Sequence, residues 1–100
     1  MREDTKFVGT EQDFENAIRE YLPKFVLNDK WFYEIEKNVS EQEFTNICEA
    51  IAEAINRGYI KDKINVHYMM NGSISFSHVV TSDKPQPYQL SELGKHFLGL

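Results

Sequence analysis

The stretch that decides the fold class is residues 64–80, INVHYMMNGSISFSHVV. Apolar and polar residues alternate on both sides of Asn71-Gly72, and a period of two is typical of a half-buried strand. Because Asn-Gly is a common turn pair, the stretch predicts a β-hairpin. Helical patterns precede it along the chain. The predicted fold class is therefore α+β, with helices first and a hairpin after them.

The register of this hairpin follows from the faces that each turn would produce. A two-residue turn at Asn71-Gly72 would place apolar residues opposite polar ones on both faces. A three-residue loop over residues 70–72, with Gly72 left-handed as a G1 bulge, gives one apolar and one polar face. The predicted register pairs Tyr68 with Ile74, Val66 with Phe76 and Ile64 with His78.

The clearest helix is predicted to begin after Ser40, which opens the capping box Ser40-Glu41-Gln42-Glu43. Apolar residues then recur at helical spacing, which predicts one continuous inward face. Arg57 suits the negative end of the helix, and Gly58 suits the left-handed position that follows. The inward face consists of Phe44, Ile47, Cys48, Ile51, Ala54 and Ile55.

Thr10 is predicted to cap an earlier helix, with Asp13 at its third position and an apolar stripe from Phe14 to Leu22. Pro23 either stops this helix or stands at a new start. Residues 24–38 fit a short helix or a strand, and we favour the helix because a strong helix follows directly. Residues 88–90 suit a short edge strand, and Ser91 can cap a last short helix.

The chain is predicted to form one domain over residues 10–100, after a flexible N-terminus of residues 1–9 without periodicity. No apolar run is long enough to span a bilayer, and the first residues do not read as a signal peptide. The single cysteine, Cys48, cannot close a disulfide within the chain. These features predict a cytoplasmic protein with no membrane partner.

The order of elements is that of a winged helix-turn-helix domain, and residues 39–98 carry motifs that resemble a known family. They resemble the YjcQ-like family of small phage and prophage winged-helix proteins. The resemblance implies a winged-helix fold and a mobile-element origin more than an activity. Its motifs are Val39-Ser40-Glu41, Phe44, Arg57-Gly58-Tyr59-Ile60 and Leu90-Ser91-x-x-Gly94-x-x-x-Leu98.

Charge is distributed unevenly around a net value of −5. Residues 1–56 hold six Lys/Arg and thirteen Asp/Glu, whereas residues 57–100 hold five Lys/Arg and three Asp/Glu. The outward side chains of the capped helix would enter the major groove in a DNA-binding winged helix, but most are acidic and would repel phosphate. Gln42 and Asn46 could read adenine edges. The predicted DNA contacts are therefore the cations around the hairpin: Arg57, Lys61, Lys63, Lys84 and Lys95.

The alternative is an acidic protein-interaction module, which would face a basic partner or a second copy of the chain. Three consecutive aromatic residues cannot all point inward, so at least one is expected to be exposed. One version of this function is a phage-type inhibitor that presents carboxylates like a phosphate backbone. The predicted partner contacts are Trp31, Phe32, Tyr33, Glu49 and Glu53.

Catalytic and cofactor chemistry find little support in the sequence. Cys48 falls on the inward face of its helix, where a free cysteine behaves as a small hydrophobic residue. The three histidines have no metal-binding spacing, and no phosphate loop or nucleophile motif is present. We therefore predict a non-enzymatic binding module with no cofactor, no metal and no small-molecule substrate.

Overall fold

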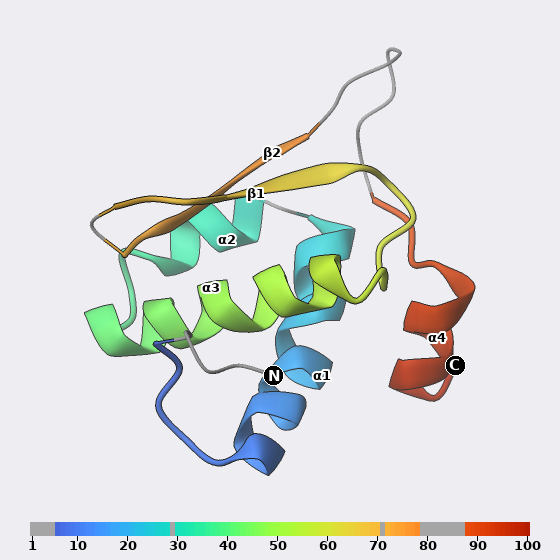
Figure 1. Cartoon of the computed structure of the whole chain (residues 1–100), viewed down its shortest axis with the longest axis horizontal. Coiled ribbons are helices and arrows are strands. Elements are labelled where there is room, and N and C mark those ends of the chain that lie inside the picture. The colour runs from blue at the N-terminus through green and yellow to red at the C-terminus, as the bar shows by residue number, and fades with distance from the viewer. Residues whose placement is uncertain (1–5, 29, 71, 79–87) are drawn as a thin grey trace.

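Three helices come first, followed by a two-stranded antiparallel hairpin and a short last helix (Figure 1). The computed structural model describes residues 6–28, 30–70, 72–78 and 88–100. The predicted α+β class, with helices before the hairpin, is confirmed. The elements are α1 (Glu11–Leu27), α2 (Lys30–Ile35), α3 (Glu41–Asn56), β1 (Ile64–Tyr68), β2 (Ile74–His78) and α4 (Glu92–Leu98).

Helix α1 begins at the predicted cap but runs further than predicted. The Thr10 hydroxyl oxygen accepts from the Asp13 amide, and the Asp13 carboxylate accepts from the Thr10 amide, both at 3.0 Å. The prediction that Pro23 stops or restarts the helix is wrong, because α1 continues through it to Leu27. This continuation keeps Phe25 and Val26 buried on the same stripe, which offsets a proline cost of about 3 kcal/mol.

The segment that fitted either a helix or a strand contains the short helix α2, so the favoured prediction is confirmed. The next helix, α3, also begins as predicted, since the Ser40 hydroxyl oxygen accepts from the Glu43 amide at 3.1 Å. It ends at Asn56, and Gly58, two residues later, has a φ of 80° in the left-handed region, as predicted.

The hairpin has the predicted register. Tyr68 pairs with Ile74, Val66 with Phe76 and Ile64 with His78. The turn is closed by the Met69 amide, which donates to the Ser73 carbonyl at 2.9 Å. Gly72 has a φ of 93°, as a G1 bulge requires. The predicted polar face is also present, since His67 Nε2 lies 2.8 Å from the Ser77 hydroxyl.

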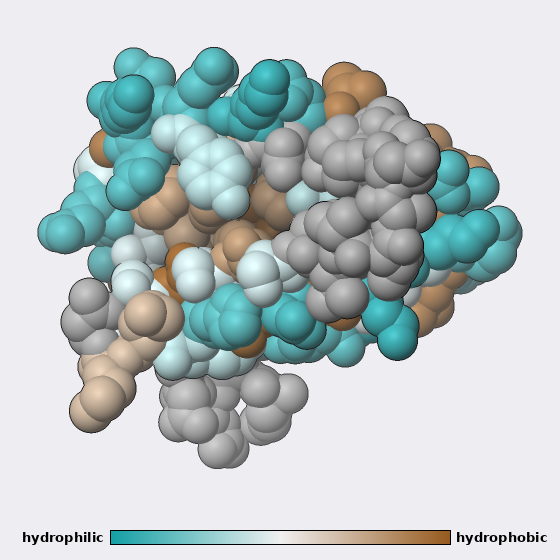
Figure 2. All heavy atoms as spheres, turned by 90° about the horizontal axis from the view of Figure 1, so that it is seen from above, coloured by the Kyte–Doolittle hydropathy of each residue, from teal (hydrophilic) through white to brown (hydrophobic). Residues whose placement is uncertain are grey.

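The core lies on two sides of α3, with α1 packed against one side and the hairpin laid across another (Figure 1). Phe25 of α1 is its hub: its ring centroid lies 5.9 Å from that of Phe32, 5.8 Å from that of Phe76 and 5.4 Å from that of Tyr88. The hairpin leaves Phe44, Ile74 and Phe76 only half-buried. Figure 2 shows apolar side chains on this side, with hydrophilic residues above and below them in the view.

The C-terminal segment is fixed to the end of α3. The edge strand predicted for residues 88–90 is present as one antiparallel bridge between Ile60 and Leu90. Ser91 joins the two segments, because its amide donates to the Tyr59 carbonyl at 3.0 Å and its hydroxyl to the Gly58 carbonyl at 2.6 Å. In the described parts of the chain, no helix is both long and apolar enough to cross a membrane.

Candidate functional site

An N-terminal strap, residues 6–9, covers one face of α3. The Lys6 amide donates to the Glu49 carboxylate at 3.1 Å, and the Val8 amide donates to the Asn46 side-chain oxygen at 3.1 Å. The Gln42 side chain returns a bond of 3.3 Å to the Lys6 carbonyl. Residues 6–9 of the N-terminus expected to be flexible are therefore bound to α3, because helix side chains satisfy their backbone. Residues 1–5 lie outside the described residues.

The strap occupies three residues of α3 that the sequence assigned to DNA or to a partner: Gln42, Asn46 and Glu49. Gln42 and Asn46 bind the backbone of the strap, so their amides are already engaged in hydrogen bonds and are less available to read DNA bases. Glu49 is only 7% exposed under the strap. Glu49 is therefore a poor candidate for the predicted partner contact, since its carboxylate already accepts a hydrogen bond inside the fold.

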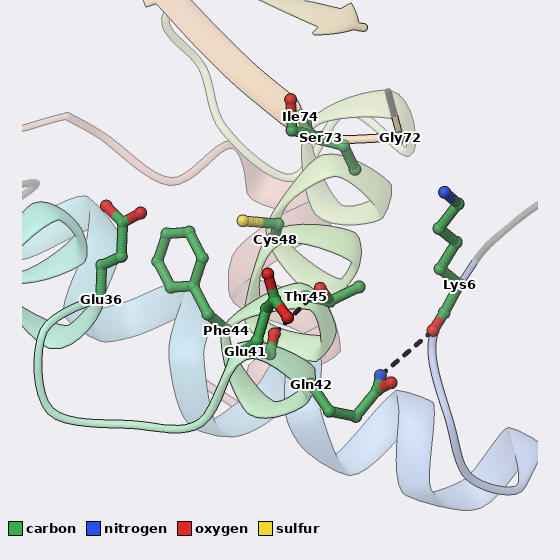
Figure 3. Close-up of a pocket in the computed structure, with 10 residues that line it drawn as sticks. All are labelled: Lys6, Glu36, Glu41, Gln42, Phe44, Thr45, Cys48, Gly72, Ser73 and Ile74. Atoms are coloured by element: carbon green, nitrogen blue, oxygen red, sulfur yellow. Dashed lines mark hydrogen bonds between the residues drawn. The ribbon is translucent and has the colours of Figure 1, made fainter. Parts of the chain in front are cut away.

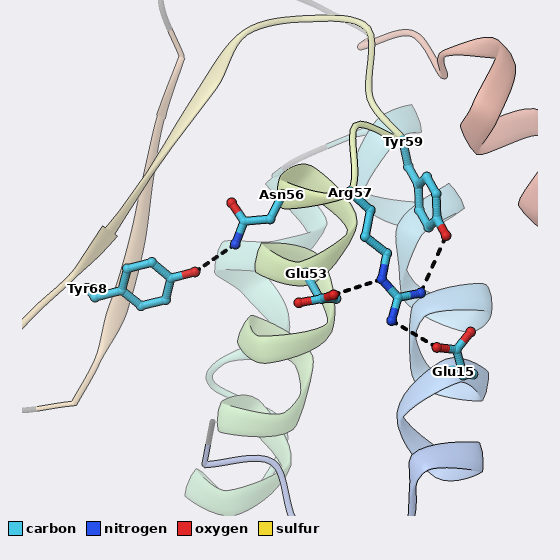
Figure 4. Close-up of polar contacts among 6 residues, drawn as sticks. All are labelled: Glu15, Glu53, Asn56, Arg57, Tyr59 and Tyr68. Atoms are coloured by element: carbon cyan, nitrogen blue, oxygen red, sulfur yellow. Dashed lines mark hydrogen bonds and ion pairs between the residues drawn. The ribbon is translucent and has the colours of Figure 1, made fainter. Parts of the chain in front are cut away.

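Arg57 is held by two acidic side chains (Figure 4). Its Nε lies 2.7 Å from the Glu53 carboxylate, and its Nη2 lies 2.9 Å from the Glu15 carboxylate. Partial burial alone would lower the pKa of Arg57, but the hydrogen bonds to Glu15, Tyr59 and Glu53 outweigh it and raise that pKa. The guanidinium therefore joins α1 to the end of α3. It is a poor candidate for phosphate contact, and Glu53 is a poor candidate for partner contact.

Two of the other predicted DNA contacts lie close together. Lys61 and Lys95 both line a hollow of about 620 Å³ at the base of the hairpin, although Lys95 also lies 3.7 Å from Glu92. Lys63 is exposed at the start of the hairpin. Lys84 falls outside the described residues. The structure thus brings Lys61 and Lys95 together at one hollow, whereas Arg57 is held in ion pairs inside the fold.

The three consecutive aromatic residues have three different environments. Phe32 is 4% exposed and packs against Phe25 and Phe44, so it is a poor candidate for the predicted partner contact. Trp31 is half-buried and stacks on Tyr21, with 5.9 Å between the ring centroids. Tyr33 is 55% exposed, which confirms that at least one ring of the run faces solvent.

A cavity of about 460 Å³ lies where the hairpin tip overhangs the start of α3 (Figure 3). We define the hairpin tip by its described residues, Met69, Met70, Gly72 and Ser73. The cavity was not predicted, because its walls come from three stretches that are distant in sequence: Lys6, residues 36–48 and residues 72–74. No local sequence pattern predicts that these stretches come together. The lining residues are Lys6, Glu36, Glu41, Gln42, Phe44, Thr45, Cys48, Gly72, Ser73 and Ile74.

Cys48 forms part of the cavity floor and is 5% exposed, which confirms its predicted place on the inward face of α3. Burial and, to a smaller extent, the charges of Glu36 and Glu49 raise the pKa of the Cys48 thiol to about 12. Since the thiolate is the reactive form, this thiol is a poor nucleophile at neutral pH.

Cys48 should therefore react slowly with a disulfide reagent such as dithionitrobenzoate. Near pH 8 we expect a rate about a thousandfold below that of the chain unfolded in guanidinium, because the thiolate is that much rarer. The raised pKa also implies a pH dependence. Its contribution to stability is complete below the thiol's ordinary pKa of 9.0 and is lost as pH rises towards 12, because the unfolded chain ionises first.

Cys48→Ala provides the control for both measurements. It should not react with the reagent, and its free energy of unfolding should fall less steeply above pH 9 than that of the original chain. Reaction of the folded chain as fast as the unfolded one would contradict the buried thiol.

No group of three or more potential metal ligands occurs among the described residues. No protein-family model, no curated protein and no solved structure matches this chain.

Proposed function

We propose that this chain is a non-enzymatic protein-interaction module that binds a basic partner at the end where the hairpin tip overhangs α3. The observation that carries this proposal is the combination of charge and apolar surface at that end. Glu36 and Glu41 line the cavity there. Met69 is 50% exposed, and Met70 is fully exposed beside the cavity roof. Methionine is enriched in protein interfaces, because its flexible side chain adapts to a partner's surface.

The winged-helix arrangement is part of the same proposal. Helices α1, α2 and α3 followed by a hairpin have the order of a helix-turn-helix with one wing, and this order supports it. The resemblance to the YjcQ-like family stays a prediction. Within such a domain, α3 would be the helix that enters DNA. The strap on Gln42, Asn46 and Glu49, together with the acidic residues around it, favours a protein partner over DNA.

The test uses a fluorescent ten-residue peptide of alternating arginine and valine and a matched peptide of alternating glutamate and valine. Anisotropy should show saturable binding of the basic peptide alone, weaker at higher salt. A Met69→Ser/Met70→Ser variant should bind about tenfold more weakly, because the contact loses apolar area at constant charge.

Leu27→Ser is the matched control, since Leu27 is 74% exposed at the end of α1 and belongs neither to the tip nor to the cavity lining. It should leave the affinity unchanged. Light scattering on the same samples tests whether the chain binds a second copy of itself. Failure of the basic peptide to bind at low salt would overturn the proposal.

A second candidate function, DNA binding by a phage-type regulator, is favoured by one observation. Lys61 and Lys95 line the same hollow and could contact neighbouring phosphates. The affinity for a mixed-sequence duplex, measured by fluorescence anisotropy, should then fall steeply as salt increases. A Lys61→Gln/Lys95→Gln variant should show a weaker dependence of this affinity on salt. Absence of duplex binding at low salt would exclude this candidate.

A further inference from the structure

The cavity under the hairpin tip has unbalanced charge. Glu36 approaches it from the turn after α2, and Glu41 from the first turn of α3 (Figure 3). Neither carboxylate takes part in an ion pair within the described parts of the chain. The neighbouring Thr45 hydroxyl donates to the Glu41 backbone carbonyl at 3.0 Å and not to the Glu41 carboxylate.

The cation that lines the cavity lies away from these carboxylates. The ammonium of Lys6 comes so close to Gly72 that a Cβ at this glycine would collide with it. In Figure 3 Lys6 and Glu36 stand on opposite sides of the cavity. With two carboxylates and one lysine, the lining is net negative and suits one additional cationic group.

The floor of the cavity is apolar and contains a polar group without a partner. Phe44 and Ile74 are half-buried there. The Cys48 thiol, only 5% exposed, lines the cavity and has no hydrogen-bond partner among the described residues. An occupant must therefore combine an apolar stem with a cationic, donor-rich end. Lysine and arginine side chains both have this form.

Arginine fits the lining better than lysine. Its planar guanidinium presents five donors in a fixed fork, so one group can reach carboxylates on two different elements. The same plane stacks on an aromatic ring, and Figure 3 shows the Phe44 ring between Glu36 and Glu41. The volume of about 460 Å³ lies within the roughly 300–1,000 Å³ range of small-ligand sites.

We propose that this cavity is the binding slot for one arginine side chain of the partner, inserted between Glu36, Glu41 and Phe44. This inference rests on the proposed function, because it names the group by which a basic partner is recognised at the hairpin tip. The stem of the arginine lies over Ile74 and Cys48, and its guanidinium binds both carboxylates.

The test is a titration of the ¹⁵N-labelled chain with the blocked tripeptide acetyl-Gly-Arg-Gly-amide, followed by amide chemical shifts. We expect saturable shifts within residues 41–48 and 72–74, with a Kd in the millimolar range for so small a ligand. The citrulline tripeptide, which has the same shape without the charge, should bind at least about tenfold more weakly.

Glu36→Gln and Glu41→Gln should each lower the affinity for the arginine tripeptide by about fivefold or more. Glu20→Gln is the matched control, because it removes the same charge from an exposed position on α1 and should leave the affinity unchanged. Retention of the folded spectrum in each variant excludes unfolding as the cause.

The outcomes separate the inference from the function it rests on. The arginine slot would be overturned if the citrulline tripeptide, or a tripeptide with lysine in place of arginine, bound as tightly as the arginine tripeptide. Unchanged affinity in Glu36→Gln and Glu41→Gln would also overturn it. If the arginine–valine peptide still binds in that case, the proposed function stands without it. If neither the tripeptide nor the longer peptide binds, both proposals fail.

Discussion

A Phe25→Ala variant is expected to lose about 3–5 kcal/mol of unfolding free energy, one of the largest losses that a single substitution causes in a domain of this size. Phe25 is 2% exposed, and its ring packs against Phe32, Phe76 and Tyr88. These rings come from α2, from the hairpin and from the segment before α4. Removing the shared ring therefore leaves a cavity where four parts of the chain meet.

Urea denaturation followed by circular dichroism measures this loss. The control is Leu27→Ala, two residues along the same helix, because Leu27 is 74% exposed and should change the free energy of unfolding by less than about 0.5 kcal/mol. A loss below about 1 kcal/mol for Phe25→Ala would contradict the hub that we describe.

Replacing Gly94 by alanine should destabilise the chain by about 2–3 kcal/mol, although the same change inside an ordinary helix stabilises it by about 1 kcal/mol. Gly94 is buried in α4 against the backbone of Tyr59. A Cβ there would collide with the Tyr59 carbonyl oxygen and lie 3.0 Å from its carbonyl carbon. Because backbone cannot move aside as a side chain can, α4 would have to shift away from the end of α3.

The displacement of α4 should be measurable by hydrogen exchange as well as by the loss of stability. Amide hydrogens of α4 should exchange faster in Gly94→Ala, and the hydrogen bonds from Ser91 to Gly58 and Tyr59 should weaken. Leu93→Ala, at an adjacent position that is 54% exposed, controls for helix propensity and should leave exchange in α4 nearly unchanged. A stabilised Gly94→Ala variant would show that α4 does not pack this closely.

Local chemistry explains which parts of the fold could be predicted from the sequence. The hairpin register follows from Gly72 and from the alternation on either side, since a wrong register would place apolar groups in water. The caps at Thr10 and Ser40 depend on residues three positions apart. The prediction for Pro23 is wrong because the local cost of the proline is outweighed by the burial of Phe25 and Val26, which depends on distant partners.

The candidate site was less predictable for the same reason. Glu36 and Glu41 look like ordinary surface residues in the sequence, and only the fold shows that they line a cavity together with the hairpin tip. Arg57 seemed available to DNA because the sequence does not show that Glu15, 42 residues earlier, would bind it. The buried position of Cys48 was predicted correctly from the spacing of apolar residues, but not the cavity in front of it.

The N-terminal strap also has a consequence for how the chain is made. Lys6 bonds to Glu49, 43 residues later, so the strap leaves the ribosome well before its binding face on α3 exists. At synthesis rates of roughly 5–20 residues per second, the strap waits for roughly 2–9 seconds. Phe7, which packs edge-on against Phe14 in the folded chain, can contact α1 during that interval, before α3 is complete. The segment made early can thus be secured only after the first half of α3 has been made.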